Sequence, residues 1–243
     1  MSNSLLRAAR ILASVAAEPQ TVSALAAEFG VHRSTMFREL QDLEQVGFVR
    51  RLGDGRFVPG LQLVVLGNAA LEQLDLRAAA FEHARRLHRI VGNTIHVGGL
   101  VGDEIVYVDK VEDAAGIRMY SRIGAAVQPN CSGLGKAVLA SLPLGRRDAV
   151  LAHCEWRRYT ANTLTTRAAL DAELAVAARR GWAVDDAEFE EFVNCVAVPI
   201  ISSAGVVGAL SLTALRAVQN LAQLQRQVPL LLQTAADIAH DLG

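Results

Sequence analysis

Three short amphipathic segments, separated by glycine or proline and followed by a hairpin pattern, occupy the start of the chain. Ser4 can cap a helix whose apolar residues recur every three or four positions until Pro19. Thr21 can cap a second helix that stops at Gly30, and a third helix is predicted over 33–46. A short helix, a tight glycine turn and an amphipathic helix together predict a helix-turn-helix.

A β-hairpin is predicted directly after the third helix. Residues 48–52 and 56–58 have the pattern of two strands around the turn Gly53-Asp54-Gly55. Such a hairpin is a wing, whose arginines can reach phosphates beside the groove that the third helix occupies. The residues predicted to contact double-stranded DNA are Arg33, Ser34, Thr35, Arg38, Gln41, Arg51 and Arg56.

Charge does not distinguish a DNA-binding domain from a winged helix used for protein contacts. The net charge of the chain is −1, and residues 31–58 carry five arginines against four acidic residues. A protein that coats DNA is strongly basic, so the prediction depends on the pattern and not on charge.

Composition excludes several classes of protein. The sequence contains no run of eighteen apolar residues, and residues 1–10 lack the apolar stretch of a secretory signal, so we expect a cytoplasmic protein without a membrane segment. The cysteines, Cys131, Cys154 and Cys195, are odd in number and far apart, which predicts neither a disulfide framework nor a metal site. We expect no cofactor.

Beyond residue 60 the pattern predicts a stiff helix and then a larger domain. Residues 61–76 are apolar at helical spacing, and an exposed apolar side would suit a dimer contact. Further helices are predicted at 78–91, 136–141, 146–154, 167–179 and 221–238, with Pro229 expected to kink or restart the last one. Strands are predicted at 94–100, 104–111, 116–123, 182–184, 196–201 and 206–213. Hairpin-connected strands in two groups predict an α+β domain with an antiparallel sheet and flanking helices.

Several motifs carry a resemblance that spans nearly the whole chain. Val22 to Leu40 and Phe57 to Gly67 resemble the DNA-binding segment of the IclR family of transcriptional regulators. The signatures of that family's second domain are similar, in order and spacing, to Pro129–Ala140, Gly181–Glu188, Asn194–Ile200 and Val206–Thr213. Asn130 stands where a histidine is common and Phe192 where a glycine is common. Both lie near the expected pocket, so these two differences affect the identity of the expected ligand more than the expected fold.

The resemblance implies a ligand-responsive regulator of a catabolic operon, either a repressor or an activator, and not an enzyme. It implies a winged helix-turn-helix domain over 1–60, a linker helix over 61–76, and a GAF-like domain over 77–243 for effector binding and oligomerisation. The implied partners are an operator DNA, a small organic or aromatic acid as effector, and further copies of the chain in a homodimer or dimer of dimers.

The resemblance also implies which residues line the effector pocket. They are Ile117, Tyr120, Gly133, Leu134, Asp185, Val193, Cys195, Ser211 and Thr213. Tyr120 and Phe192 favour an aromatic or larger acid. Arg118 and Arg122 either pair with its carboxylate or lie on the surface.

The glycines and hydroxyls of this domain each have two interpretations. The run Gly133-Leu134-Gly135-Lys136 lacks the frame of a phosphate loop, with Ala137 in place of the hydroxyl that binds Mg²⁺. Its glycines either expose N–H groups to an anionic ligand or only begin a helix. Ser211 and Thr213 share one face of a strand, where a ligand or the backbone can satisfy their hydroxyls.

The cysteines raise an enzymatic alternative. Cys131 or Cys195 could act as a nucleophile only if the fold brought a histidine, such as His96 or His153, within hydrogen-bond reach. Otherwise Cys195 is a small core residue of its strand.

Overall fold

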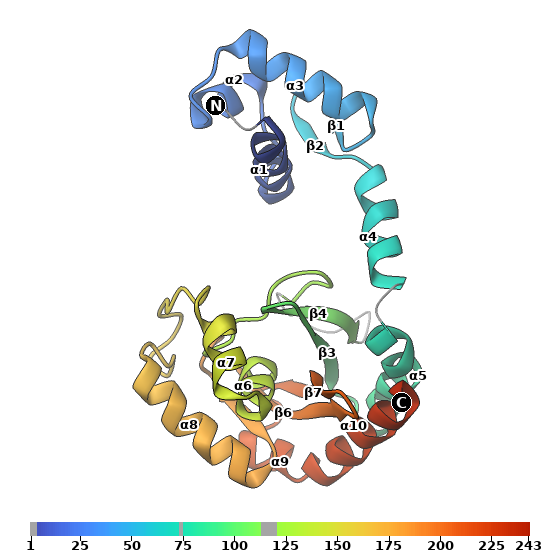
Figure 1. The fold of residues 1–243 in the computed structure, drawn as a ribbon, viewed down its shortest axis with the longest axis vertical. Coiled ribbons are helices and arrows are strands. Elements are labelled where there is room, and N and C mark those ends of the chain that lie inside the picture. Colours follow the sequence, from blue (N-terminus) through green and yellow to red (C-terminus); the bar gives the residue numbers. More distant parts are fainter. Residues whose placement is uncertain (1–3, 73–74, 113–120) are drawn as a thin grey trace. The chain divides into compact units, whose positions relative to one another are not determined.

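We analysed a computed structural model, which describes residues 4–72, 75–112 and 121–243 (Figure 1). The chain divides into two compact units, Met1–Gln73 and Leu74–Gly243, and each is described by itself.

The first unit is a winged helix-turn-helix, as the sequence predicts. Its elements are α1 (Ser4–Ala17), α2 (Val22–Glu28), α3 (Arg33–Gln45), the antiparallel strands β1 (Val49–Arg51) and β2 (Phe57–Pro59), and α4 (Gln62–Glu72). The Thr21 side chain caps α2 by accepting a hydrogen bond from the Ala24 N–H at 3.1 Å. Apolar side chains of the helices and the hairpin form one core, which includes Ile11, Leu25, Met36, Leu40 and Phe57.

The second unit is built on one five-stranded antiparallel sheet with the order β4-β3-β7-β6-β5. The strands are β3 (Thr94–Val101), β4 (Glu104–Val111), β5 (Ala183–Asp186), β6 (Val193–Ser202) and β7 (Gly205–Leu215). One face packs on α5 (Asp75–Val91), α9 (Leu221–Gln225) and α10 (Val228–Leu242). The other face packs on α6 (Gly133–Ser141), α7 (Leu144–Leu151) and α8 (Arg167–Arg180). Helices therefore cover both faces of the sheet (Figure 1).

One predicted helix boundary differs from the structure, the prediction for Pro229 is confirmed, and one predicted strand lies mostly outside the described residues. The boundary between the helices predicted over 61–76 and 78–91 lies earlier in the structure, since α4 ends at Glu72 and α5 begins at Asp75, an acidic residue favoured in the first turn of a helix. Pro229 restarts the last helix, because it occupies the first turn of α10, where its missing N–H costs no hydrogen bond. The strand predicted over 116–123 lies mostly outside the described residues, and 121–123 are not a strand.

Strand register brings the site residues together. Asp185 pairs with Cys195, and Cys195 pairs with Thr213. Ser211, two residues before Thr213 on β7 and therefore on the same face of the sheet, pairs with His96 of β3. Because paired residues in a sheet project to the same side, these side chains share the face covered by α6. No helix in the described part of the chain is long and apolar enough to cross a bilayer.

Candidate functional site

All seven residues predicted to contact DNA are exposed in the first unit. Helix α3 buries Met36, Leu40 and Leu43 in the core, so its opposite side is free to approach another molecule. That side carries Ser34, Arg38 and Gln41, and Arg33 and Thr35 are exposed in the first turn of the helix. The hairpin carries Arg51 and Arg56.

The two hairpin arginines have different partners. The Arg56 guanidinium pairs with Asp54 at 2.7 Å and holds the pKa of that carboxyl below its usual value. Arg51 lies over the ring of Phe57, with 6.0 Å between the guanidinium carbon and the ring centroid. Asp54 therefore partly neutralises the charge that Arg56 can offer to a phosphate, whereas Arg51 lies over a neutral ring.

A cavity of about 50 Å³ lies beside the N-terminus of α6. Seven residues predicted for the effector pocket line it: Gly133, Leu134, Asp185, Val193, Cys195, Ser211 and Thr213. The other two predicted residues, Ile117 and Tyr120, lie outside the described residues, as does Arg118.

Three residues expected near the pocket lie elsewhere. Phe192 is half exposed, and it is not among the described residues that line the cavity. Asn130 is buried and donates a hydrogen bond to the Leu164 carbonyl at 2.6 Å, also outside the described lining. Arg122 is exposed. Neither Phe192 nor Asn130 belongs to the lining that the structure describes, although each is close in sequence to a residue that does, Val193 and Ser132.

Sequence reasoning missed six residues that line the cavity: His96, Tyr107, Ser121, Ser132, Phe189 and Glu190. His96 is the most informative of them, because its ring hydrogen-bonds with two hydroxyls, Ser121 Oγ at 2.7 Å and Thr213 Oγ1 at 3.4 Å. Burial, with a smaller effect from Lys110, lowers the pKa of His96 to about 3. The ring is therefore neutral at pH 7 and offers one N–H donor and one acceptor.

The N-terminus of α6 forms one wall of the cavity. Ser132 caps the helix, and its Oγ accepts a hydrogen bond from the Gly135 N–H at 3.0 Å. The N–H groups of Gly133 and Leu134 belong to the first turn, where a helix provides no acceptor. A Cβ at Gly133 would come within 2.8 Å of Cys195 Sγ, so any side chain at this position would require the Cys195 side chain to move.

The carboxyl of Asp185 lies on the opposite wall. It is buried, and burial raises the pKa of Asp185 to about 7, although the Glu188 N–H donates to its Oδ1 at 2.7 Å. Protonation of this group near neutral pH would convert one carboxylate oxygen from an acceptor to a donor.

The cysteines do not form a catalytic pair. Burial raises the pKa of Cys195 to about 12 and that of Cys131 above its ordinary value. Both are therefore thiols at pH 7, and in the described part of the chain neither thiol is hydrogen-bonded to a histidine. His153 lines a different cavity. Among the residues described, no cluster of three or more potential ligands could hold a metal ion.

An exposed recognition helix with a wing, joined to a separate domain, defines the class of helix-turn-helix transcriptional regulators with a C-terminal effector domain. Residues 4–53 match the family model described as the IclR helix-turn-helix domain. Residues 68–240 match the model described as bacterial transcriptional regulator IclR C-terminal. The chain belongs to the IclR family.

Named relatives and solved structures cover the full length of the chain. It is 32% identical to the HTH-type transcriptional regulator KdgR of Escherichia coli, over 99% of this chain and 93% of the relative. Identity to XynR of the same species is also 32%, over 88% and 86%. The Thermotoga maritima IclR structure matches all of both chains, with 32% identity and a TM-score of 0.80. An IclR homolog of Microbacterium hydrocarbonoxydans complexed with 4-hydroxybenzoate matches 99% of both chains, with 25% identity and a TM-score of 0.82. KdgR and XynR are named as transcriptional regulators, not as enzymes.

Proposed function

We propose that this chain regulates a catabolic operon, as repressor or activator, and that a small organic acid bound in the cavity modulates its binding to operator DNA in the cytoplasm. The supporting observation is convergence: residues predicted from separate sequence motifs line one cavity. We propose residues 1–60 for DNA binding, 61–76 as the linker, and 77–243 for effector binding and oligomerisation.

The lining supports an acid as the effector. The first N–H groups of α6 and the hydroxyls of Ser211 and Thr213 can donate hydrogen bonds to a carboxylate. The dipole of α6 also favours an anion at this end of the helix. The cavity is smaller than the roughly 150 Å³ cavity that admits benzene. A small acid therefore fits with less movement of the walls than an aromatic acid, such as the 4-hydroxybenzoate bound by one relative.

The exposed apolar side of α4 and the residue before it supports the proposed homodimer or dimer of dimers. Leu61, Val64 and Val65, spaced three and four positions apart, are exposed on one side of the helix, and Leu66 is exposed on another. Apolar side chains clustered on one surface are typical of a protein–protein contact.

A gel-shift experiment tests the proposal. The full chain is incubated with duplex DNA from upstream of its own operon, at physiological salt, with and without a series of monocarboxylates. We expect binding that one or more acids change. Absence of a shift with every upstream fragment would remove the assignment of the first unit to DNA binding.

The first prediction concerns α3 and the hairpin. Arg38→Ala should weaken operator binding by about 1–3 kcal/mol per half-site, because Arg38 is exposed on the side of α3 opposite the core and can reach a base edge. Arg56→Ala should weaken binding to all sequences alike and reduce its salt dependence, since a phosphate contact carries no sequence information. Binding isotherms at two salt concentrations separate the effects. Wild-type affinity in both variants would contradict the proposed interface.

A second prediction separates ligand binding from DNA binding. Ser211→Ala should weaken effector binding by roughly 1–3 kcal/mol, because an effector oxygen loses its hydrogen-bond partner in a buried site. Operator affinity without effector should stay the same, since a ligand acts only through its differential affinity for two states. Calorimetric titration beside gel shifts measures both. Unchanged effector affinity would remove Ser211 from the site.

A further inference from the structure

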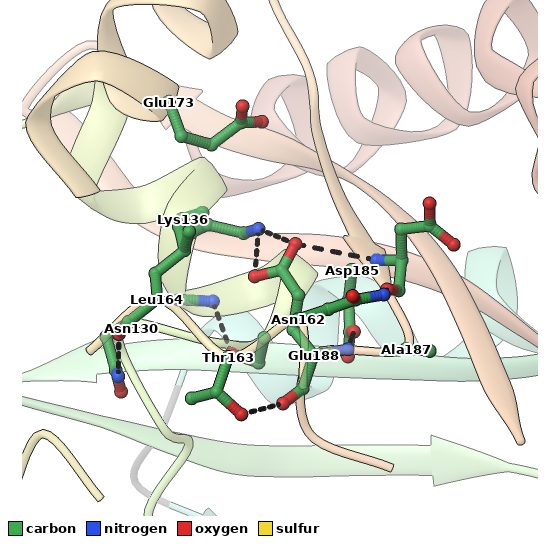
Figure 2. A network of polar contacts seen from close by, with 12 residues as sticks. Asn130, Lys136, Asn162, Thr163, Leu164, Glu173, Asp185, Ala187 and Glu188 are labelled. Atoms are coloured by element: carbon green, nitrogen blue, oxygen red, sulfur yellow. Dashed lines mark hydrogen bonds and ion pairs between the residues drawn. The ribbon is translucent and has the colours of Figure 1, made fainter. Parts of the chain in front are cut away.

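A buried ion pair lies behind the cavity and is not part of its described lining. Lys136 of α6 donates to both carboxylate oxygens of Glu188, each at 2.5 Å, and Figure 2 shows the two side chains pointing toward each other. The side chain of Lys136 is 0% exposed and that of Glu188 is 9% exposed. Since each charge neutralises the other, the pair adds little net charge to the cavity, and its contribution is geometric.

The turn that contains Glu188 is held by side chains of a second turn, residues 160–163. Three successive backbone carbonyls accept hydrogen bonds from it: Asp186 from Asn162 at 2.8 Å, Ala187 from Thr160 at 2.7 Å and Glu188 from Thr163 at 2.7 Å. Ala187 has a φ of +55°, a left-handed conformation that residues other than glycine adopt only when the surroundings enforce it. The 160–163 turn therefore fixes the path of residues 186–188.

This network joins the two walls of the cavity. On one wall, the Glu188 N–H donates to Asp185 Oδ1, and Phe189 follows directly in the lining. On the other wall, Lys136 is one helical turn beyond Gly133. Asn130, which precedes α6, donates to the carbonyl of Leu164, the residue directly after the 160–163 turn, so the continuous segment 160–164 hydrogen-bonds to both sides (Figure 2).

We propose that Lys136, Glu188 and the 160–163 turn are positioning residues of the effector site, which hold the N-terminus of α6 and Asp185 at the separation that an acid ligand needs. The proposal rests on the proposed function, because it takes the cavity as the effector site. None of these residues touches the ligand. They set its affinity through the geometry of the groups that do.

Hydrogen exchange followed by mass spectrometry or NMR tests the coupling without any ligand. Thr163→Val removes the hydroxyl that donates to Glu188, and Thr163→Ser restores it. The matched control is Thr234→Val in α10, because Thr234 is also 5% exposed and also donates its hydroxyl to a backbone carbonyl, that of Leu230 at 2.9 Å.

We expect Thr163→Val to raise amide exchange about tenfold or more in both walls, at residues 186–190 and at 133–136. Thr163→Ser and Thr234→Val should leave both segments as in the wild type. An increase limited to residues 159–164, or spread evenly over the second unit, would overturn the proposal. If Thr163→Val does not fold, Asn162→Ala, which removes the donor to the Asp186 carbonyl from the same turn, receives the same measurement and the same criteria.

Calorimetry with pyruvate and benzoate as probes gives the functional readout. Whichever probe binds the wild type should bind Thr163→Val about tenfold more weakly, while operator affinity without acid stays unchanged. Equal probe affinity, or loss of operator binding, would overturn the positioning role. A wild type that binds operator but neither probe would count against these acids as effectors in the proposed function, and the exchange result would then decide the positioning role.

Discussion

Replacing Lys136 with methionine is expected to lower the free energy of unfolding by about 3–5 kcal/mol. The substitution leaves Glu188 buried without its cation, and burial already raises the pKa of Glu188 against the opposing effect of Lys136. Without Lys136 the carboxyl must either stay charged in the interior or take up a proton, and both cost free energy. Urea denaturation of the full chain at pH 7, followed by circular dichroism, measures the loss.

Two variants make this prediction specific. Lys136→Met combined with Glu188→Gln should recover most of the loss, because a buried ion pair can often be replaced by neutral groups at little cost. Arg167→Met, which removes an arginine paired with Asp148 and Asp171 at the surface, should cost less than about 1 kcal/mol. A loss as small in Lys136→Met as in Arg167→Met would show that the interior pair is not what stabilises this region.

Local sequence signals predicted the elements of the first unit well. Thr21 caps α2 in the structure, and Gly47, at a φ of +76°, follows α3 where the left-handed conformation favours glycine. Caps and glycine stops act within a few residues, so a single sequence contains all the information they need. The boundary between the next two helices is predicted after residue 76, whereas α4 ends at Glu72 and α5 begins at Asp75, because the apolar spacing continues to Leu76.

The lining of the cavity was predicted only in part, for a physical reason. Gly133, Asp185 and Ser211 lie in motifs that the family resemblance identified. His96 lies in no such motif, and it reaches the cavity because β3 pairs with β7, more than a hundred residues along the chain. Long-range strand register leaves no local signal.

The buried charges were also beyond local reasoning. Lys136 lies in a glycine-rich run within the family signature Pro129–Ala140, and nothing in that run indicates that its side chain is buried. Its partner Glu188 is 52 residues away, and only the fold shows that both are buried. The sequence places Asn130 near the pocket, and only the fold shows that its side chain donates a hydrogen bond to the backbone carbonyl of Leu164.

Asp185→Asn is expected to make the stability of the protein less dependent on pH. Burial raises the pKa of Asp185 to about 7. Below pH 4 the carboxyl is therefore protonated in both the folded and the unfolded chain, and it does not change the free energy of unfolding with pH. Between pH 4 and 7 the unfolded chain releases this proton and the folded chain keeps it. The wild type therefore loses about 1.4 kcal/mol of stability per pH unit from this group, roughly 4 kcal/mol in total above pH 7.

The difference in unfolding free energy between Asp185→Asn and the wild type should consequently rise in favour of the variant from pH 4 to pH 7 and then remain constant. Urea denaturation at each pH unit from 4 to 8 measures this difference. Asparagine is the chosen substitution because its side-chain oxygen can still accept the hydrogen bond from the Glu188 N–H. Asp186→Asn removes an exposed carboxylate from the same strand and controls for the change in net charge. If the difference for Asp185→Asn stayed flat across the range, Asp185 would be ionised in the folded protein at all these pH values, and a proton on this carboxyl could not take part in recognising an acid.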